Sequence, residues 1–157
     1  MSRKQVAVAF SGGLDTSYLV AWLKETAKAE VVTVLVHTGG TSPAGLKTIE
    51  ARAMAVGADR HFTIDGRQET FDRVVKILIQ GNVLRANTYP LCVAAERVTQ
   101  AELLVRKALE LGIRTIAHGS TGAGNDQVRF DVSFRTLAPD CEILAPIREQ
   151  GLTREQE

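Results

Sequence analysis

The chain has 157 residues, of which 45% are hydrophobic and 24% are charged, and its formal net charge is +1. This length and composition predict one domain with one packed core and argue against disorder. Because the net charge is nearly zero and no run of Lys or Arg stands out, the composition gives no indication of a nucleic-acid-binding or membrane-binding surface.

Short apolar runs typical of buried strands alternate along the chain with longer helical patterns. Strands are predicted at residues 6–10, 30–37, 60–65 and 113–118, and near 142–145. Helices are predicted at residues 14–28, from Pro43 to near Gly57, at 67–84 and at 91–111, with Gly112 as the cap of the last one. Strands that are apolar throughout and alternate with helices predict an α/β fold, a doubly wound five-stranded parallel sheet flanked by helices.

The segment at residues 125–137 fits two kinds of structure. Val128, Phe130, Val132 and Phe134 alternate with polar residues, which is the pattern of a strand. The preceding Asn125-Asp126 pair could instead begin a helix, where Asp126 would be favourable in the first turn. The residues alone leave both structures open.

A short polar loop separates the first predicted strand from the first predicted helix. Its sequence is Ser11-Gly12-Gly13-Leu14-Asp15-Thr16-Ser17. A strand, a tight turn and a helix N-terminus present free N–H groups and the positive end of a helix dipole, which suits a phosphate. The two glycines allow close approach, because they have no Cβ. Asp15 would repel a bare phosphate, so we expect it to act through Mg²⁺ shared with the phosphates.

Three polar loops follow the carboxyl ends of predicted strands, at residues 11–17, 36–40 and 119–126. In open parallel sheets, ligands bind beyond the carboxyl ends of the strands, at the point where the strand order reverses. The three loops are therefore expected to meet in one crevice.

The first loop resembles the Ser-Gly-Gly-x-Asp-[Ser/Thr]-Ser loop of the PP-loop ATP pyrophosphatases, which split ATP into AMP and pyrophosphate. It is neither a Walker A sequence nor G-x-G-x-x-G. Other segments carry a more specific resemblance, and these are Asn87-Thr88-Tyr89-Pro90-Leu91, His118-Gly119-Ser120-Thr121-Gly122-Ala123-Gly124-Asn125-Asp126-Gln127-Val128-Arg129-Phe130, Leu137-Ala138-Pro139-Asp140 and Ala145-Pro146-Ile147-Arg148. With these segments, nearly the whole chain resembles the argininosuccinate synthase family. The resemblance implies a PP-loop, HUP-like fold and a helix at residues 127–137.

The resemblance also implies an activity, the ATP-dependent joining of citrulline to aspartate in arginine biosynthesis. In this family the ureido oxygen of citrulline attacks the α-phosphate, giving a citrullyl-adenylate and pyrophosphate, and the aspartate amine then displaces AMP. No side chain is assigned as a general acid or base. Positioning and charge stabilisation are therefore expected to supply most of the rate.

Carried onto this sequence residue by residue, the resemblance implies three sets of contacts. The ATP-binding residues would be Ala9, Phe10, Ser11, Gly12, Gly13, Leu14, Asp15, Thr16, Ser17, Val36 and Gly119, with Mg²⁺ at Asp15 directly or indirectly. Aspartate would contact Thr121, Asn125 and Asp126. Citrulline would contact Tyr89, Asn125 and Arg129.

Simpler roles stay open for several of these residues. Asn125 and Asp126 could merely cap a helix, and Arg129 could form a surface ion pair. Tyr89 could pack beside Pro90 without touching a ligand. His118 ends a predicted strand and is expected to be structural.

Two functions of other classes also stay open. One is a different PP-loop activity, such as amidation or thiolation of a base in RNA, which would favour a basic face or a poised cysteine pair. The other is a non-catalytic ATP-binding module, which would not need the amino-acid loop at residues 119–129.

Two segments beside the expected amino-acid pocket depart from the family pattern. Ala94 stands where the family usually has a Ser that touches citrulline, and Glu96 lies nearby. The loop after the second strand reads His37-Thr38-Gly39-Gly40 where the family usually has Asp-x-Gly-Gln. We hypothesise an N-acylated citrulline, whose α-nitrogen carries no charge. The alternative is citrulline itself, bound with water in place of the lost hydroxyl.

Several features bear on compartment and completeness. No apolar stretch is long enough to span a bilayer, the N-terminus does not resemble a signal peptide, and Cys92 and Cys141 lack metal-type spacing. We therefore expect a cytoplasmic protein with reduced thiols. Residues 151–157 resemble the start of a helix with Thr153 as its cap. Family members are longer, with a second domain that completes the citrulline site and a tail used in tetramer formation. Residues 1–157 are thus expected to be a nucleotide-binding domain cut before that second domain, with the full-length form a homotetramer.

Overall fold

The computed structural model describes residues 3–121 and 125–151. Its main feature is a five-stranded sheet in the order β3-β2-β1-β6-β7, in which every neighbouring pair is parallel. The strands are β1 (Gln5–Ala9), β2 (Glu30–His37), β3 (Arg60–Asp65), β6 (Thr115–His118) and β7 (Glu142–Leu144). The predicted α/β fold is confirmed, and the strand bounds match the prediction to within about two residues.

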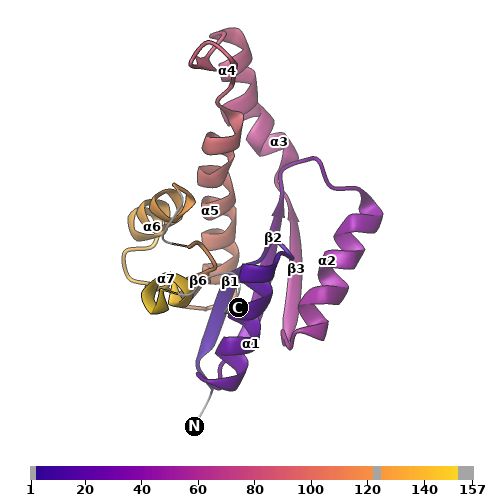
Figure 1. Ribbon diagram of the computed structural model, residues 1–157, viewed down its shortest axis with the longest axis vertical. Helices are drawn as coiled ribbons and strands as arrows, with labels where there is room; N and C mark the ends of the chain where they lie inside the picture. Colours follow the sequence, from indigo (N-terminus) through magenta and orange to yellow (C-terminus); the bar gives the residue numbers. More distant parts are fainter. Residues whose placement is uncertain (1–2, 122–124, 152–157) are drawn as a thin grey trace.

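Helices cover both faces of the sheet (Figure 1). One face carries α1 (Leu14–Glu25) and α2 (Pro43–Ala55), and the other carries α5 (Cys92–Glu110) and α6 (Asp126–Leu137). Side chains alternate between the two faces along a strand, so Val6 and Val8 pack with α1 whereas Ala7 faces α5. Each large side chain buried in this way stabilises the fold by roughly 1.5–3 kcal/mol.

The ends of these helices follow local backbone chemistry. Ser42 caps α2, since its hydroxyl oxygen accepts a hydrogen bond from the Gly45 N–H at 3.1 Å, and Pro43 occupies the first turn. Gly112, with a φ of 73°, follows the last turn of α5. Helix α1 ends at Glu25, earlier than predicted, and Lys28 beyond it has a φ of 51° that a right-handed helix cannot contain.

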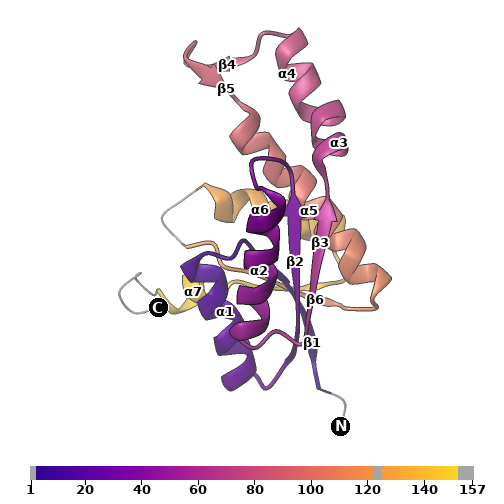
Figure 2. The same ribbon diagram turned by 90° about the vertical axis from the view of Figure 1, so that its right-hand side faces the viewer.

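The segment after β3 differs from the single helix predicted to reach residue 84. It contains α3 (Arg67–Thr70), a π-helical segment η1 (Phe71–Val75), α4 (Lys76–Gln80) and a hairpin of β4 (Leu84–Arg85) and β5 (Tyr89–Pro90). The helix stops because Asn82, with a φ of 46°, turns the chain out of the helical conformation. Helices α3 and α4 and the hairpin project beyond the sheet (Figures 1 and 2). Phe71 and Ile79 there remain 47% and 68% exposed, so the rest of the described chain covers only part of the apolar face that suggested the helix.

Residues 126–137 form the helix α6, so the strand pattern was wrong and the helix implied by the resemblance is confirmed. Phe130 and Phe134 stack on each other at 5.6 Å between ring centroids and face the core. Val128 and Val132 lie on another face and are 57% and 58% exposed. Residues that alternate with period two are also four apart in pairs, which is why this sequence suited both structures.

The short helix α7 (Pro146–Gln150) was not predicted, and Gly151 ends it with a φ of 63°. The predicted helix start around Thr153 lies outside the described residues. Cys141 is a free cysteine, whereas the Cys92 side chain lies outside the described part of the structure. Within the described residues, no helix has both the length and the apolar character needed to cross a bilayer.

Candidate functional site

A cavity of about 810 Å³ opens at the carboxyl ends of β1, β2 and β6. From the central strand β1, the strands β2 and β3 extend the sheet toward one edge, and β6 and β7 then extend it toward the other edge. The cavity therefore lies at the topological switch point, where open parallel sheets bind ligands. The loops after β1 and β6 line it, as predicted, but β2 contributes its own residues 34–36 in place of the loop that follows it.

Most of the site residues suggested by the sequence share this cavity. Those that line it are Ala9, Phe10, Ser11, Gly13, Leu14, Asp15, Thr16, Val36, Gly119, Thr121, Asn125, Asp126 and Arg129. Gly12 and Ser17 belong to the same loop but do not line the cavity. The Tyr89 side chain and residues 122–124 lie outside the described part of the structure, so the predicted Tyr89 contact stays a prediction.

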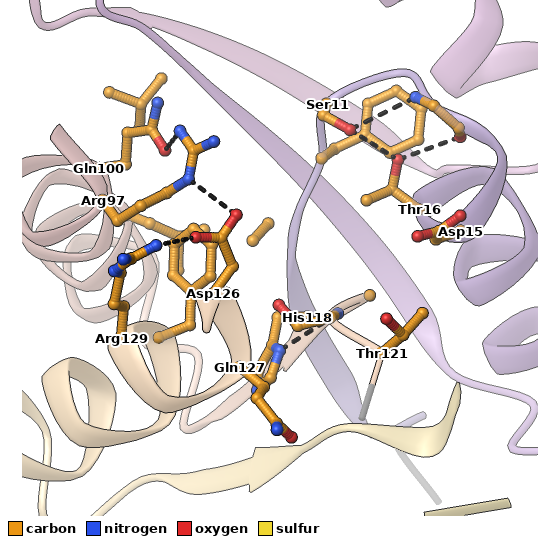
Figure 3. Close-up of a pocket in the computed structure, with 18 of the residues that line it drawn as sticks. Ser11, Asp15, Thr16, Arg97, Gln100, His118, Thr121, Asp126, Gln127 and Arg129 are labelled. Atoms are coloured by element: carbon orange, nitrogen blue, oxygen red, sulfur yellow. Dashed lines mark hydrogen bonds and ion pairs between the residues drawn. The ribbon is translucent and has the colours of Figure 1, made fainter. Parts of the chain in front are cut away.

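Hydroxyl groups shape the loop between β1 and α1. Thr16 Oγ1 donates to the Gly13 carbonyl oxygen at 3.2 Å and lies 3.3 Å from Ser11 Oγ (Figure 3). Ser17 Oγ donates to the same carbonyl oxygen at 2.8 Å. Gly13 is the N-cap residue of α1 and offers no side chain to the first turn. The N–H groups at this helix end, with the positive end of the helix dipole, are therefore suited to an anion in the cavity.

Helix α2 supports this loop from behind through Gly12. Gly12 has a φ of 78°, and a Cβ placed there would lie 3.1 Å from Ile49 Cγ1. Arg52 Nη1 donates a hydrogen bond to the Gly12 carbonyl oxygen. Because that carbonyl and the Gly13 N–H belong to one planar peptide group, Arg52 also orients the Gly13 N–H. Arg52 was not among the predicted site residues, because nothing in the pattern of α2 distinguishes it from a surface arginine.

Replacing Arg52 with Met is expected to weaken Mg-ATP binding about tenfold, the value of one hydrogen bond from a charged group. The matched control is Lys47→Met, which removes the same charge from an exposed position of the same helix. Isothermal titration of both variants with Mg-ATP measures the difference. Equal loss of affinity in the two variants would attribute the effect to charge and not to the Gly12 contact.

Asp126, at the start of α6, lies between two arginines, across the cavity from Ser11 and Thr16 (Figure 3). Arg129 Nη1 donates to Asp126 Oδ1 at 2.7 Å, and Arg97 Nε donates to Oδ2 at 3.3 Å. Burial alone would raise the pKa of Asp126, but hydrogen bonds and charges from these arginines outweigh it and lower the pKa. An ionised carboxylate is thus held in a fixed place in the cavity wall.

The simple capping role left open for Asn125 does not match the structure. Asn125 occupies the N-cap position of α6, yet its side chain makes no capping hydrogen bond. The amide group remains available to a ligand in the cavity that it lines.

Arg97 is a site residue that the sequence analysis missed. It projects from α5 and also donates to Glu96 Oε1 at 2.6 Å and Gln100 Oε1 at 3.2 Å. Thr38 Oγ1, in the loop after β2, donates to Glu96 Oε2 at 3.2 Å. The two segments that depart from the family pattern, residues 37–40 and 94–96, are therefore connected to Asp126 through Thr38, Glu96 and Arg97. In the sequence, the one signal of Arg97 was its charge on the helix that borders the predicted crevice.

The two glycine-rich loops lie against each other. A Cβ added to Gly119 would lie 3.2 Å from the Asp15 carbonyl carbon and 3.3 Å from Thr16 Cγ2. Glycine is therefore needed at this position for the loop after β6 to approach the N-terminus of α1 so closely.

Comparison with known proteins identifies the family. Residues 5–157 match the family model described as "Arginosuccinate synthase N-terminal HUP domain". The chain belongs to the argininosuccinate synthase family. It is 44% identical to argininosuccinate synthase of Saccharolobus solfataricus, over 98% of this chain and 39% of that protein. It is 43% identical to argininosuccinate synthase of Pyrobaculum aerophilum, over 100% of this chain and 39% of that protein. The chain thus spans 39% of the length of these curated relatives.

Among solved structures, the fold is similar to an NH3-dependent NAD synthetase from Campylobacter jejuni determined in complex with the nitrate ion. The TM-score is 0.55 at 14% sequence identity, over 77% of this chain and 49% of that chain. At this identity the likeness concerns the fold alone. The family and the HUP-like fold predicted from the sequence are confirmed.

Proposed function

We propose that this chain forms the nucleotide-binding and aspartate-binding part of an argininosuccinate synthase, which joins a citrulline-type ureido substrate to aspartate at the expense of ATP. The observation that carries the proposal is one cavity shared by the N-terminus of α1, the loop after β6 and the Asp126 carboxylate. The family match over residues 5–157 supports it independently.

ATP would place its phosphates at the loop between β1 and α1, and its nucleoside near Ala9, Phe10, Val36 and Gly119. The glycines and the free helix end fit a pyrophosphate leaving group, which needs many N–H donors. Among the described residues, no group of three or more His, Cys, Asp or Glu side chains is placed to hold a metal ion. Mg²⁺ would therefore be shared between Asp15 and the phosphate oxygens, an arrangement that Mg²⁺ commonly adopts.

The amino-acid substrates would bind on the α6 side of the cavity. Thr121, Asn125 and Asp126 would hold aspartate, with its ammonium group on the Asp126 carboxylate. That carboxylate already accepts two hydrogen bonds, but its two oxygens offer about four acceptor positions. Arg129 and Asn125, with Tyr89, would hold the ureido substrate, because a guanidinium has donors left for a carboxylate after one contact.

In the proposed reaction, no side chain is assigned as a general acid or base. The ureido oxygen would attack the α-phosphorus as pyrophosphate leaves. The aspartate ammonium would then lose a proton to water, and the resulting amine would displace AMP from the activated carbon. Donors at the N-terminus of α1 would stabilise the charge that develops on pyrophosphate. Holding the reactants within attack distance would supply the remaining acceleration.

The contacts of Glu96 favour an N-acylated citrulline over citrulline as the ureido substrate. The Ala94 side chain lies outside the described part of the structure, but Glu96 is already paired with Arg97 at 2.6 Å and accepts from Thr38. Because Glu96 is paired in this way and does not line the cavity, it offers little to a charged α-ammonium group. An acylated α-nitrogen carries no charge and therefore does not need a carboxylate partner.

Thermal unfolding with aspartate tests the proposal on the chain itself. At a hundredfold excess over its Kd, aspartate is expected to stabilise the fold by about 2.7 kcal/mol, which raises Tm by about 5–10 °C. Glutamate serves as the control ligand, because one more methylene displaces its side-chain carboxylate. Stabilisation by Mg-ATP without any effect of aspartate would favour a different PP-loop activity or an ATP-binding module.

AMP formation from Mg-ATP and aspartate then separates the two ureido substrates. We expect AMP with N-acetylcitrulline and much less with citrulline. AMP with citrulline alone would show that the departures at Ala94, at Glu96 and in the loop at residues 37–40 do not change the substrate. Absence of AMP with both, while aspartate and Mg-ATP still bind, would limit this chain to the binding role.

A further inference from the structure

His118, the last residue of β6, is a buried histidine in the cavity wall. Its side chain is 1% exposed, and its ring packs on Phe130 and Phe134 of α6, with ring centroids 6.0 and 5.9 Å away. Nε2 lies 3.2 Å from Asp131 Oδ1, and Nδ1 lies 3.4 Å from the backbone nitrogen of Ser120. Both ring nitrogens therefore have partners, one on α6 and one in the loop after β6.

These partners determine which nitrogen carries the proton. A backbone N–H can only donate, so the Nδ1 atom that faces Ser120 must be the unprotonated acceptor. Nε2 must then carry the hydrogen and donate it to Asp131. Asp131 also accepts from the Arg148 guanidinium of α7. Burial would raise the pKa of Asp131, but the hydrogen bonds from Arg148 and His118 lower it, so this carboxylate stays ionised.

We propose that His118 is a positioning residue, whose neutral ring holds the Ser120 N–H and thereby places Gly119 and Thr121 in the cavity. The inference rests on the proposed function, in which Gly119 contacts ATP and Thr121 contacts aspartate. The close approach of Gly119 to the Asp15 backbone makes the position of this loop matter, because a small shift there disturbs the N-terminus of α1.

The ring can act as an acceptor only while it is neutral. Burial lowers the pKa of His118, and Arg148 adds to the lowering, while Asp131 and Glu149 oppose it. Protonation would place a hydrogen on Nδ1 against the Ser120 N–H, leaving two donors face to face. The loop is therefore held at and above the ordinary histidine pKa of about 6.5, and it is released as pH falls through the lower pKa of the folded state.

Three substitutions separate the two hydrogen bonds of His118. Asn places its carbonyl oxygen where Nδ1 was but cannot reach Asp131, so His118→Asn keeps the loop contact alone. Gln reaches toward Asp131 but has no acceptor at the Nδ1 position, and His118→Phe keeps only the ring packing. The control is Ile113→Ala, which creates a cavity in the same core, at a position 1% exposed beyond the other end of β6.

Two readouts need no ligand. Nitrogen-15 NMR of the chain is expected to find the ring hydrogen of His118 on Nε2. Amide exchange at Ser120 is expected to accelerate about tenfold in the Gln and Phe variants and to stay near wild type in the Asn variant. A hydrogen on Nδ1, or equal exchange in the Asn and Gln variants, would overturn the proposal.

Titration with Mg-ATP connects this geometry to binding. We expect affinity to fall about tenfold in the Gln and Phe variants, and to stay within about twofold in the Asn variant and in Ile113→Ala. If all four variants lost Mg-ATP affinity equally, in proportion to their loss of Tm, the role of His118 would be limited to packing. A wild-type chain that binds no Mg-ATP would contradict the proposed function, while the tautomer and the exchange data would still decide the role of His118.

Discussion

Gly12→Ala is expected to weaken Mg-ATP binding about hundredfold. The new Cβ would lie 3.1 and 3.2 Å from the two γ-carbons of Ile49, at a residue whose φ of 78° is already costly for alanine. The strain is relieved by turning the peptide that carries the Gly13 N–H, which also moves the Gly12 carbonyl oxygen away from Arg52. Misplacing the Gly13 N–H and the next one, the Leu14 N–H at the start of α1, at about 1.5 kcal/mol each, accounts for a loss of that size.

Gly112→Ala is the matched control for this substitution. Gly112 has a φ of 73°, nearly the same as Gly12, but an added Cβ there meets nothing within 4 Å. Both variants should lose about 1–2 kcal/mol of folding free energy from the left-handed conformation, measured by urea unfolding. Only Gly12→Ala should lose Mg-ATP affinity in an isothermal titration. Wild-type affinity in Gly12→Ala would place the phosphates elsewhere in the cavity.

The sheet was predictable because the pattern of apolar residues in a strand reflects which of its faces are buried. A strand covered on both faces is apolar at nearly every position, so residues 30–37 were located with their observed bounds. The strand order of such a sheet places the ligand at the switch point, which is where the cavity lies. The position of the site thus followed from the fold class before any motif was considered.

Where the prediction failed, the deciding contact was not local. Residues 126–137 fit a strand or a helix by period, and the packing of Phe130 and Phe134 against His118 is what distinguishes the two. In the projecting segment, apolar residues at helical spacing predicted a covered face, yet Ile79 is 68% exposed. A pattern of apolar residues indicates which positions share a face but not whether another element covers it.

The missed site residues, Arg52 and Arg97, share one property. Each contacts the loops from a helix far away in the sequence, 40 residues from Gly12 and 29 residues from Asp126. The loop motifs were visible because glycines and hydroxyls cluster in a few consecutive positions. An arginine that supports a loop only after folding leaves no such cluster.

Asp126→Asn is expected to weaken aspartate binding about thirtyfold while leaving Mg-ATP affinity within about twofold of wild type. Asn keeps the shape of the side chain but removes the charge that would pair with the substrate ammonium. It also leaves the Arg97 and Arg129 guanidiniums without their shared carboxylate, so the net charge at the site becomes repulsive to an ammonium group. Losing one member of such a group costs about 2–5 kcal/mol when buried, and the 44% exposure of this side chain places the effect near the lower end.

The control is Asp140→Asn, which removes the same charge from an exposed position just beyond α6. Comparing the Tm shift that aspartate produces in the two variants isolates the effect of the site from that of net charge. The pKa of Asp126 is lowered, so this side chain stays charged as pH falls to 3.8, the ordinary pKa of an aspartate side chain. Titration of Asp126 should therefore not weaken binding of the aspartate substrate in the wild type above that pH. A parallel loss of Mg-ATP and aspartate affinity in Asp126→Asn would mean that the carboxylate holds the two arginines in place for the whole cavity. An unchanged aspartate affinity would assign the substrate ammonium to another group and require a different orientation of aspartate in the site.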